Sequence, residues 1–111
     1  MKTESMPQLN HTLHLTDRQR WRYETDEFYG VCEIAHDSMV VKIVFEGVSN
    51  KFYDVLAIDG YITWCLKKPI SVERLAEQLS SLFPDLDVTV SGRAKTHGWI
   101  TSSVTKRYPA S

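Results

Sequence analysis

The chain of 111 residues has few of the features that mark a specific chemistry. It has only two cysteines, Cys32 and Cys65, and neither belongs to a CxxC motif or to a cluster of cysteine and histidine ligands. This spacing predicts no metal site, and we expect two free, buried thiols. No apolar run marks the N-terminus as a secretory signal, so we expect a cytoplasmic protein.

Long apolar runs are also missing, so the sequence predicts no membrane-spanning helix. The formal net charge is −1, which gives the whole molecule no strong attraction for nucleic acid. The charge is nevertheless uneven. Residues 1–50 hold five Lys/Arg and eight Asp/Glu, residues 51–111 hold eight and six, and the two halves therefore carry −3 and +2. Residues 88–111 contain four basic side chains and no acid, so the positive excess lies after Asp87.

Polar residues dominate the first part of the chain. Residues 1–10 are predicted to form a flexible N-terminal arm, and residues 11–111 a single domain. Residues 12–15 are typical of a short edge strand. Residues 18–27 fit either a helix or a strand, and the alternation around Trp21 favours the strand.

Two β-hairpins are predicted in the middle of the chain. In the first, residues 28–35 and 39–45 flank a turn at 36–38, and one register sets Glu33 opposite Lys42. Its apolar face is expected to hold Phe28, Cys32, Ile34, Met39, Val41, Ile43 and Phe45. In the second, Asp59-Gly60 favours a tight turn, because both turn positions of a type I′ hairpin need positive φ.

A single helix is predicted over about residues 71–83. Ser71 is a good N-cap, and Pro84 ends the helix. The apolar residues Val72, Leu75, Ala76, Leu79, Leu82 and Phe83 recur at helical spacing. Leu86, Val88 and Val90 then alternate with polar residues as in a half-buried strand, which pairs with residues 99–104 in a third hairpin. The prediction is a two-layer α+β fold: a mainly antiparallel sheet of about six strands with one amphipathic helix on one face.

Helix and strand over Ser71 to Val90 loosely resemble the corresponding stretch of the tunnelling-fold pterin enzymes. The chain lacks the zinc histidines of that family. It also lacks the glutamate that anchors the pterin ring from the strand. We therefore assign no family from this resemblance.

The basic C-terminal hairpin is the candidate binding site. Arg93, Lys95 and His97 alternate, so an extended strand places them on one face. Phosphate and carboxylate are typically bound by the forked donors of arginine guanidinium groups, by lysine ammonium groups and by backbone amides near glycines. The full candidate set is Arg93, Lys95, Thr96, His97, Lys106 and Arg107. The alternative is a solvated turn with scattered cations.

A second candidate surface is apolar. Tyr29, Leu56, Ile58 and Tyr61 are predicted on sheet faces turned away from the helix, where they would form a protein-partner or dimer interface. No catalytic residue, cofactor or metal is predicted, because no nucleophile or ligand set converges on His97.

Three functions follow from these features, in order of preference. The first is a small non-enzymatic protein that binds a protein partner or itself. The second is an anion or nucleic-acid binder that uses the basic hairpin. The third is a small enzyme or ligand-binding protein with a pocket near His97.

Overall fold

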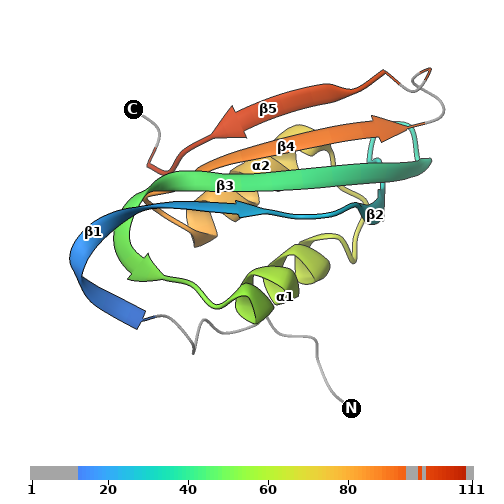
Figure 1. The fold of residues 1–111 in the computed structure, drawn as a ribbon. Coiled ribbons are helices and arrows are strands. Elements are labelled where there is room, and N and C mark those ends of the chain that lie inside the picture. Colours follow the sequence, from blue (N-terminus) through green and yellow to red (C-terminus); the bar gives the residue numbers. More distant parts are fainter. Residues whose placement is uncertain (1–12, 95–97, 99, 110–111) are drawn as a thin grey trace, which may run out of the picture.

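The computed structural model describes residues 13–94, 98 and 100–109, and the structural statements below concern these residues. Residues 1–10, predicted as an arm, lie outside them. The elements in chain order are strands β1 (Leu13–Glu24), β2 (Phe28–Val31) and β3 (Ser38–Phe52), helices α1 (Val55–Cys65) and α2 (Val72–Leu82), and strands β4 (Asp87–Ala94) and β5 (Ser102–Lys106). Five strands form one antiparallel sheet, and both helices pack on the same face of it (Figure 1). The predicted two-layer α+β fold is confirmed, with one strand fewer and one helix more than predicted.

Strand β3 is the centre of the sheet. The strand order is β1-β3-β4-β5, and β2 also pairs with β3. Strand β4 pairs with residues Met39 to Glu46 on one side of β3. On the other side, β1 pairs from Val44 onwards, and β2 pairs with residues 38–41. Strands β1 and β2 therefore form one interrupted edge, and β5 forms the other edge.

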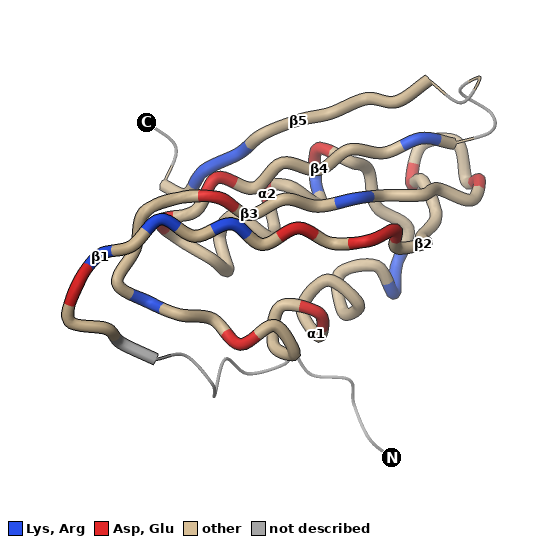
Figure 2. Tube along the Cα trace, in the orientation of Figure 1, with Lys and Arg blue, Asp and Glu red and all other residues tan. Residues whose placement is uncertain are grey.

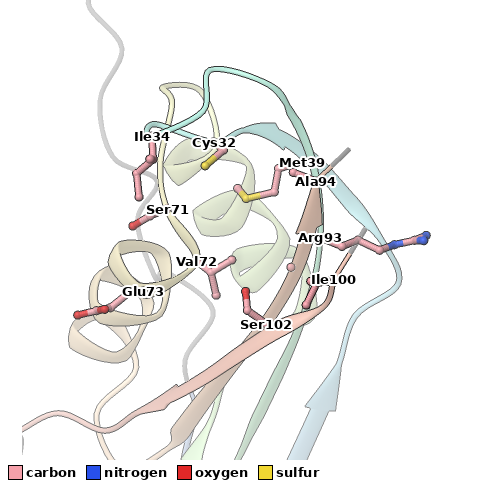
Figure 3. A pocket seen from close by; sticks show the side chains of 11 residues that line it. Cys32, Ile34, Met39, Ser71, Val72, Glu73, Arg93, Ala94, Ile100 and Ser102 are labelled. Carbon is pink, nitrogen blue, oxygen red and sulfur yellow. The ribbon is translucent and has the colours of Figure 1, made fainter. Parts of the chain in front are cut away.

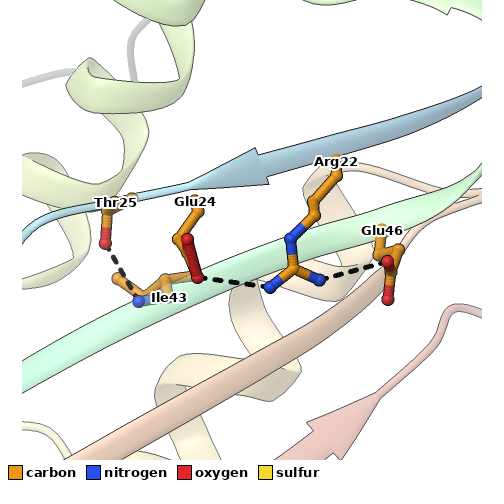
Figure 4. Close-up of polar contacts among 5 residues, drawn as sticks. All are labelled: Arg22, Glu24, Thr25, Ile43 and Glu46. Atoms are coloured by element: carbon orange, nitrogen blue, oxygen red, sulfur yellow. Dashed lines mark hydrogen bonds and ion pairs between the residues drawn. The ribbon is translucent and has the colours of Figure 1, made fainter.

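Thr25 bridges the interruption between β1 and β2. Its backbone N–H donates to the carbonyl of Ile43 at 3.0 Å, and its hydroxyl accepts from the N–H of Ile43 at 3.0 Å (Figure 4). The side chain thus replaces the backbone carbonyl that a continuous strand would supply. Beside it, Arg22 lies 3.2 Å from Glu24 on its own strand and 3.1 Å from Glu46 on β3. Of residues 18–27, which fit either a helix or a strand in sequence, 18–24 are strand and 25–27 lie outside the strands.

The first predicted hairpin is present, but its turn is longer than predicted. Val31 pairs with Ser38, and residues 32–37 form the connection. The N–H of His36 donates to the carbonyl of Cys32 at 2.8 Å, which ends the strand before Ile34. Ile34 is consequently exposed instead of lying on the apolar face. The other residues named for that face, Cys32, Met39, Val41, Ile43 and Phe45, are buried as predicted, with Phe28 partly buried.

The predicted pair of Glu33 with Lys42 is wrong, because the longer turn removes Glu33 from the sheet. Lys42 lies opposite Ser91 of β4 instead. Glu33 accepts from Arg74 of α2 at 3.2 Å. The acid therefore links the turn to the helix layer.

The second predicted hairpin is wrong, because Asp59-Gly60 lies inside helix α1. Asp54 precedes the helix, and its carboxylate accepts from the N–H of Leu56 at 3.1 Å, as an N-cap does. The buried residues of α1 recur at helical spacing: Ala57, Ile58, Tyr61, Ile62 and Cys65. Helix formation gives this segment a continuous face to bury against the sheet and α2, which an isolated hairpin at the same place would not.

Helix α2 agrees with the prediction. It runs from Val72 to Leu82, and the hydroxyl of Ser71 accepts from the N–H of Arg74 at 3.2 Å. Phe83 ends it, and its ring contacts rings from the other layer and from α1. The ring centroids lie 5.2 Å from Phe45, 5.1 Å from Tyr53 and 5.5 Å from Tyr61, all edge-to-face. This aromatic cluster joins the layers.

The third predicted hairpin is present, but its second strand is Ser102–Lys106 and not the predicted 99–104. Strand β4 pairs with β5 from Val88 opposite Lys106 to Gly92 opposite Ser102. Helix α2 approaches β4 closely at Gly92, where an added Cβ would lie 2.5 Å from Cγ2 of Val72. Within the described residues, no helix is both long enough and apolar enough to cross a bilayer.

Candidate functional site

The cations of the basic hairpin that the structure describes all lie against carboxylates. Arg93 reaches Glu27 at 3.3 Å. Lys106 lies 3.8 Å from Glu73. Arg107 donates to Asp87 at 2.8 Å, and its second contact is the carbonyl of residue 85 at 3.2 Å. The positive charge of these three residues is therefore compensated locally, and Figure 2 shows acidic and basic residues on neighbouring strands of the sheet.

Two of the three acids come from parts of the chain that the sequence does not place near the hairpin, whereas Asp87 begins β4 itself. Glu27 follows β1, and Glu73 belongs to α2. The three residues of the predicted tip, Lys95, Thr96 and His97, lie outside the described residues. The structure thus brings Arg93, Lys106 and Arg107 to three separate ion pairs, and not to one shared anion site.

The predicted interface residues are divided between surface and core. Tyr29 and Leu56 are exposed, at 73% and 75%. Ile58 and Tyr61 are buried, because α1 turns both toward the sheet where the predicted hairpin would have exposed them. These four residues therefore form no common exposed surface.

The free edge of β5 is a site that sequence reasoning missed. Among the described residues, β5 pairs with β4 alone, so its other side presents unpaired backbone N–H and C=O groups. Four of its five residues, Ser102, Ser103, Val104 and Thr105, carry no charge, and the one charged residue, Lys106, is the last of the strand. An edge strand with a long uncharged stretch is open to pairing with another strand.

The β1 part of the opposite edge is protected, whereas β2 carries no charged residue. Strand β1 carries the charged residues Asp17, Arg18, Arg20, Arg22 and Glu24. Its register with β3 also shifts between His14 and Gln19. Charge and irregular pairing both discourage strand addition. Strands β1 and β5 therefore differ in their capacity to accept a further strand.

Two hydroxyl pairs hold β5 on β4. The hydroxyls of Thr89 and Thr105 lie 2.7 Å apart, and those of Ser91 and Ser103 lie 2.8 Å apart. Both pairs are on the sheet face away from the helices. They fix β5 in register while leaving its free edge unobstructed.

An apolar hollow of about 230 Å³ lies at the start of β5 (Figure 3). We call it the β5 hollow. Its apolar lining is Cys32, Ile34, Met39, Val72, Ala94 and Ile100. Ser102 also lines it, so the hollow is continuous with the β5 edge, whereas the side chain of Arg93 points away from it.

Two large side chains of the β5 hollow are exposed. Ile34 is 74% exposed and Ile100 is 73% exposed. They come from the turn after β2 and from the segment before β5, and they line the hollow from different sides (Figure 3). Ile100, Ser102 and Val104 are spaced two residues apart, so an extended chain points them to the same face. This spacing is the one sequence signal that places Ile100 on the side of the helices.

Comparison with protein-family models finds no match, and neither the curated proteins nor the solved structures give a significant match. Function is therefore argued from the surfaces of this chain.

Proposed function

We propose that this protein is a small binding module that self-associates through the free edge of β5. The observation that carries the proposal is an edge strand whose first four residues are uncharged, next to an exposed apolar hollow. Main-chain hydrogen bonds supply the affinity of such strand pairing, and side-chain pockets supply its specificity. A second copy of the chain offers the same edge, so one patch can serve both partners around a two-fold axis.

We place two antiparallel β5 strands with Val104 at the two-fold axis. This register brings exposed side chains of the two copies opposite each other. In that register Ser103 lies opposite Thr105 of the second copy. Ile100 lies opposite Tyr108 of the second copy, beside the β5 hollow. Ile100 and Tyr108 are 73% and 53% exposed in the single chain. Pairing would cover both, which gives the interface an apolar contribution besides its backbone hydrogen bonds.

The surface chemistry supports this function over binding of nucleic acid at the basic hairpin. Arg93, Lys106 and Arg107 each lie against a carboxylate, so an arriving phosphate would have to compete with that acid. Strand pairing at β5 leaves those ion pairs intact.

Charged residues introduced at positions 103 and 105, which face each other in the proposed dimer, test the register of the two β5 strands. In the variant Ser103→Lys/Thr105→Lys, lysines from the two copies would face each other, and we expect the dimer to dissociate. In the matched variant Ser103→Glu/Thr105→Lys, each glutamate would face a lysine, and we expect the dimer to persist. Both variants remove the same two hydroxyl pairs, so they perturb β5 within its own chain alike.

Sedimentation equilibrium over a range of concentrations gives the readout for both variants. A parent chain that stays monomeric at high micromolar concentration contradicts the proposal. A Lys/Lys variant that associates as strongly as the Glu/Lys variant contradicts the register. Hydrogen exchange supplies a second readout, because amides at the free edge of β5 should gain protection as the concentration rises.

A further inference from the structure

A second hollow, of about 310 Å³, lies between helix α1 and the interrupted edge of the sheet. We call it the α1 hollow. Strand β1 ends at Glu24 and β2 begins at Phe28, and the residues between them line one side of the hollow. Residues 55–62 of α1 supply the other side. The volume lies near the lower end of the range of pockets that hold small ligands, roughly 300–1,000 Å³.

Apolar side chains from the core reach the α1 hollow. Ile58 and Ile62 of α1 line it and are buried, at 4% and 0% exposure. Tyr23 and Phe28, from the two strands, are partly buried and pack against the core. Val55, in the first turn of α1, lines the hollow but is 61% exposed. An apolar group seated here would contact the core residues and cover Val55, and the burial would contribute to binding.

The charged residues of the lining are all acids. They are Glu24, Asp26, Glu27 and Asp59, and the lining contains no lysine or arginine. Four acids without a cation give the lining a formal charge of −4, whereas the whole chain carries −1. Figure 2 shows the acidic segments at the end of β1 and on α1. Negative charge is therefore concentrated around this hollow.

Two of these acids have cation partners and two do not. Glu24 lies 3.2 Å from Arg22, and Glu27 lies 3.3 Å from Arg93. Within the part of the chain that the structure describes, the carboxylates of Asp26 and Asp59 form neither an ion pair nor a hydrogen bond. Asp26 comes from the sheet edge and Asp59 from α1, and both are exposed. A cation bound at the open side of the hollow would thus find carboxylates from both sides.

We propose that the α1 hollow binds a small organic amine, with its apolar body against Ile58 and Ile62 and its ammonium group between Asp26 and Asp59. Hydrogen bonds from an ammonium group to carboxylates are stronger than those between neutral groups. An inorganic cation would leave the apolar lining uncovered, and a neutral apolar molecule would leave the two carboxylates without a cation. The lining shares no residue with the β5 edge or the β5 hollow, so this site does not depend on self-association.

Calorimetric titration of the full chain tests the proposal with three probes: phenethylamine, phenethyl alcohol and ethylamine. We expect phenethylamine to bind most tightly, since it alone combines an apolar ring with an ammonium group. Its affinity should exceed that of the alcohol by roughly tenfold or more, the gain expected for a charge-assisted contact. The difference should shrink as the salt concentration rises, because salt screens the attraction between exposed charges.

Three results of this titration would overturn the proposal. The first is failure of phenethylamine to bind at millimolar concentration. The second is equal binding of phenethylamine and phenethyl alcohol, which would mean that the carboxylates contribute nothing. The third is equal binding of phenethylamine and ethylamine, which would mean that the acids attract any ammonium group without the hollow.

Paired charge variants locate the site. Asp26→Asn/Asp59→Asn should weaken phenethylamine binding by roughly tenfold or more and leave the binding of phenethyl alcohol unchanged. Asp17→Asn/Glu77→Gln removes the same formal charge from exposed positions outside the lining and should leave both affinities unchanged. Equal weakening by both variants would show that the amine responds only to the overall charge, and would reject the site.

Val55 allows a second test at the exposed side of the hollow. Val55→Lys brings an ammonium group of the protein itself to the lining and should weaken phenethylamine binding, because like charges repel and the lysine competes for the carboxylates. Val55→Met adds a side chain of similar length without charge and should keep the affinity close to that of the parent. Equal affinities in the two variants would contradict the position of the ammonium group. Circular dichroism of each variant establishes that its fold is retained before the affinities are compared.

Discussion

The two cysteines behave as their isolated positions in the sequence indicate. Cys32 and Cys65 are both free and buried. Burial can be predicted for them because free cysteine is among the residue types most often buried. The secondary structure around Cys65 could not be read in the same way, since it lies on a helix and not on the predicted strand.

The buried thiol of Cys65 makes the stability of the protein decrease with rising pH in the alkaline range. Its pKa in the folded chain is about 11, against 9.0 for an unperturbed thiol. A folded-state pKa above the unfolded value contributes stability that is fully present below pH 9.0 and is lost as the pH approaches about 11. The unfolding free energy of Cys65→Ala should therefore fall less steeply over this window than that of the parent. The difference in slope is at most about 1.4 kcal/mol per pH unit.

Urea denaturation at several pH values measures both slopes. Burial also raises the pKa values of Tyr23, Tyr53 and Tyr61, so both chains lose stability at high pH. The comparison with Cys65→Ala isolates the thiol because the tyrosines are common to both chains. Identical slopes would show that the thiol ionises as freely in the folded state as in the unfolded state.

Single charged residues show the limit of sequence reasoning at this scale. The run from Arg93 to Arg107 contains no acid, yet the acids that pair with its described ends come from Glu27, Glu73 and Asp87. These partners are brought in by sheet pairing and helix packing. A local charge count cannot detect them.

At the scale of elements, helix α2 could be predicted and helix α1 could not. Both end signals of α2, Ser71 and Pro84, stand in the sequence beside a clear apolar stripe. The segment of α1 is apolar almost throughout, so its residues satisfy both helical and strand spacing. Asp59-Gly60 then favoured a turn, whereas the decisive signal was the N-cap Asp54.

Gly60→Ala distinguishes the helix from a hairpin. Inside a helix, alanine in place of glycine should raise the free energy of unfolding by about 0.5–1 kcal/mol. At a turn position with positive φ, the same change would lower it. Gly98→Ala is the matched control, because Gly98 has φ +67° and its replacement should destabilise. Chemical denaturation measures both, and a loss of stability in Gly60→Ala would contradict the helical assignment.

At the scale of the whole molecule, the two layers could be predicted because an amphipathic helix must cover an apolar sheet face. The way the layers join could not. Phe83 was predicted only as the last apolar residue of a helix. In the structure it ends α2 and meets rings from β3, from α1 and from the segment between them.

Phe83→Ala should therefore destabilise the fold as a unit. Phe83 is fully buried, and loss of a buried phenylalanine ring costs about 3–5 kcal/mol. Because its neighbours belong to both layers, far-ultraviolet and near-ultraviolet circular dichroism should report one shared unfolding transition at a lower urea midpoint. The control Leu56→Ala alters a side chain that is 75% exposed and should change stability by no more than about 0.5 kcal/mol. Two separate transitions in Phe83→Ala would instead mean that the sheet keeps its structure without the aromatic cluster.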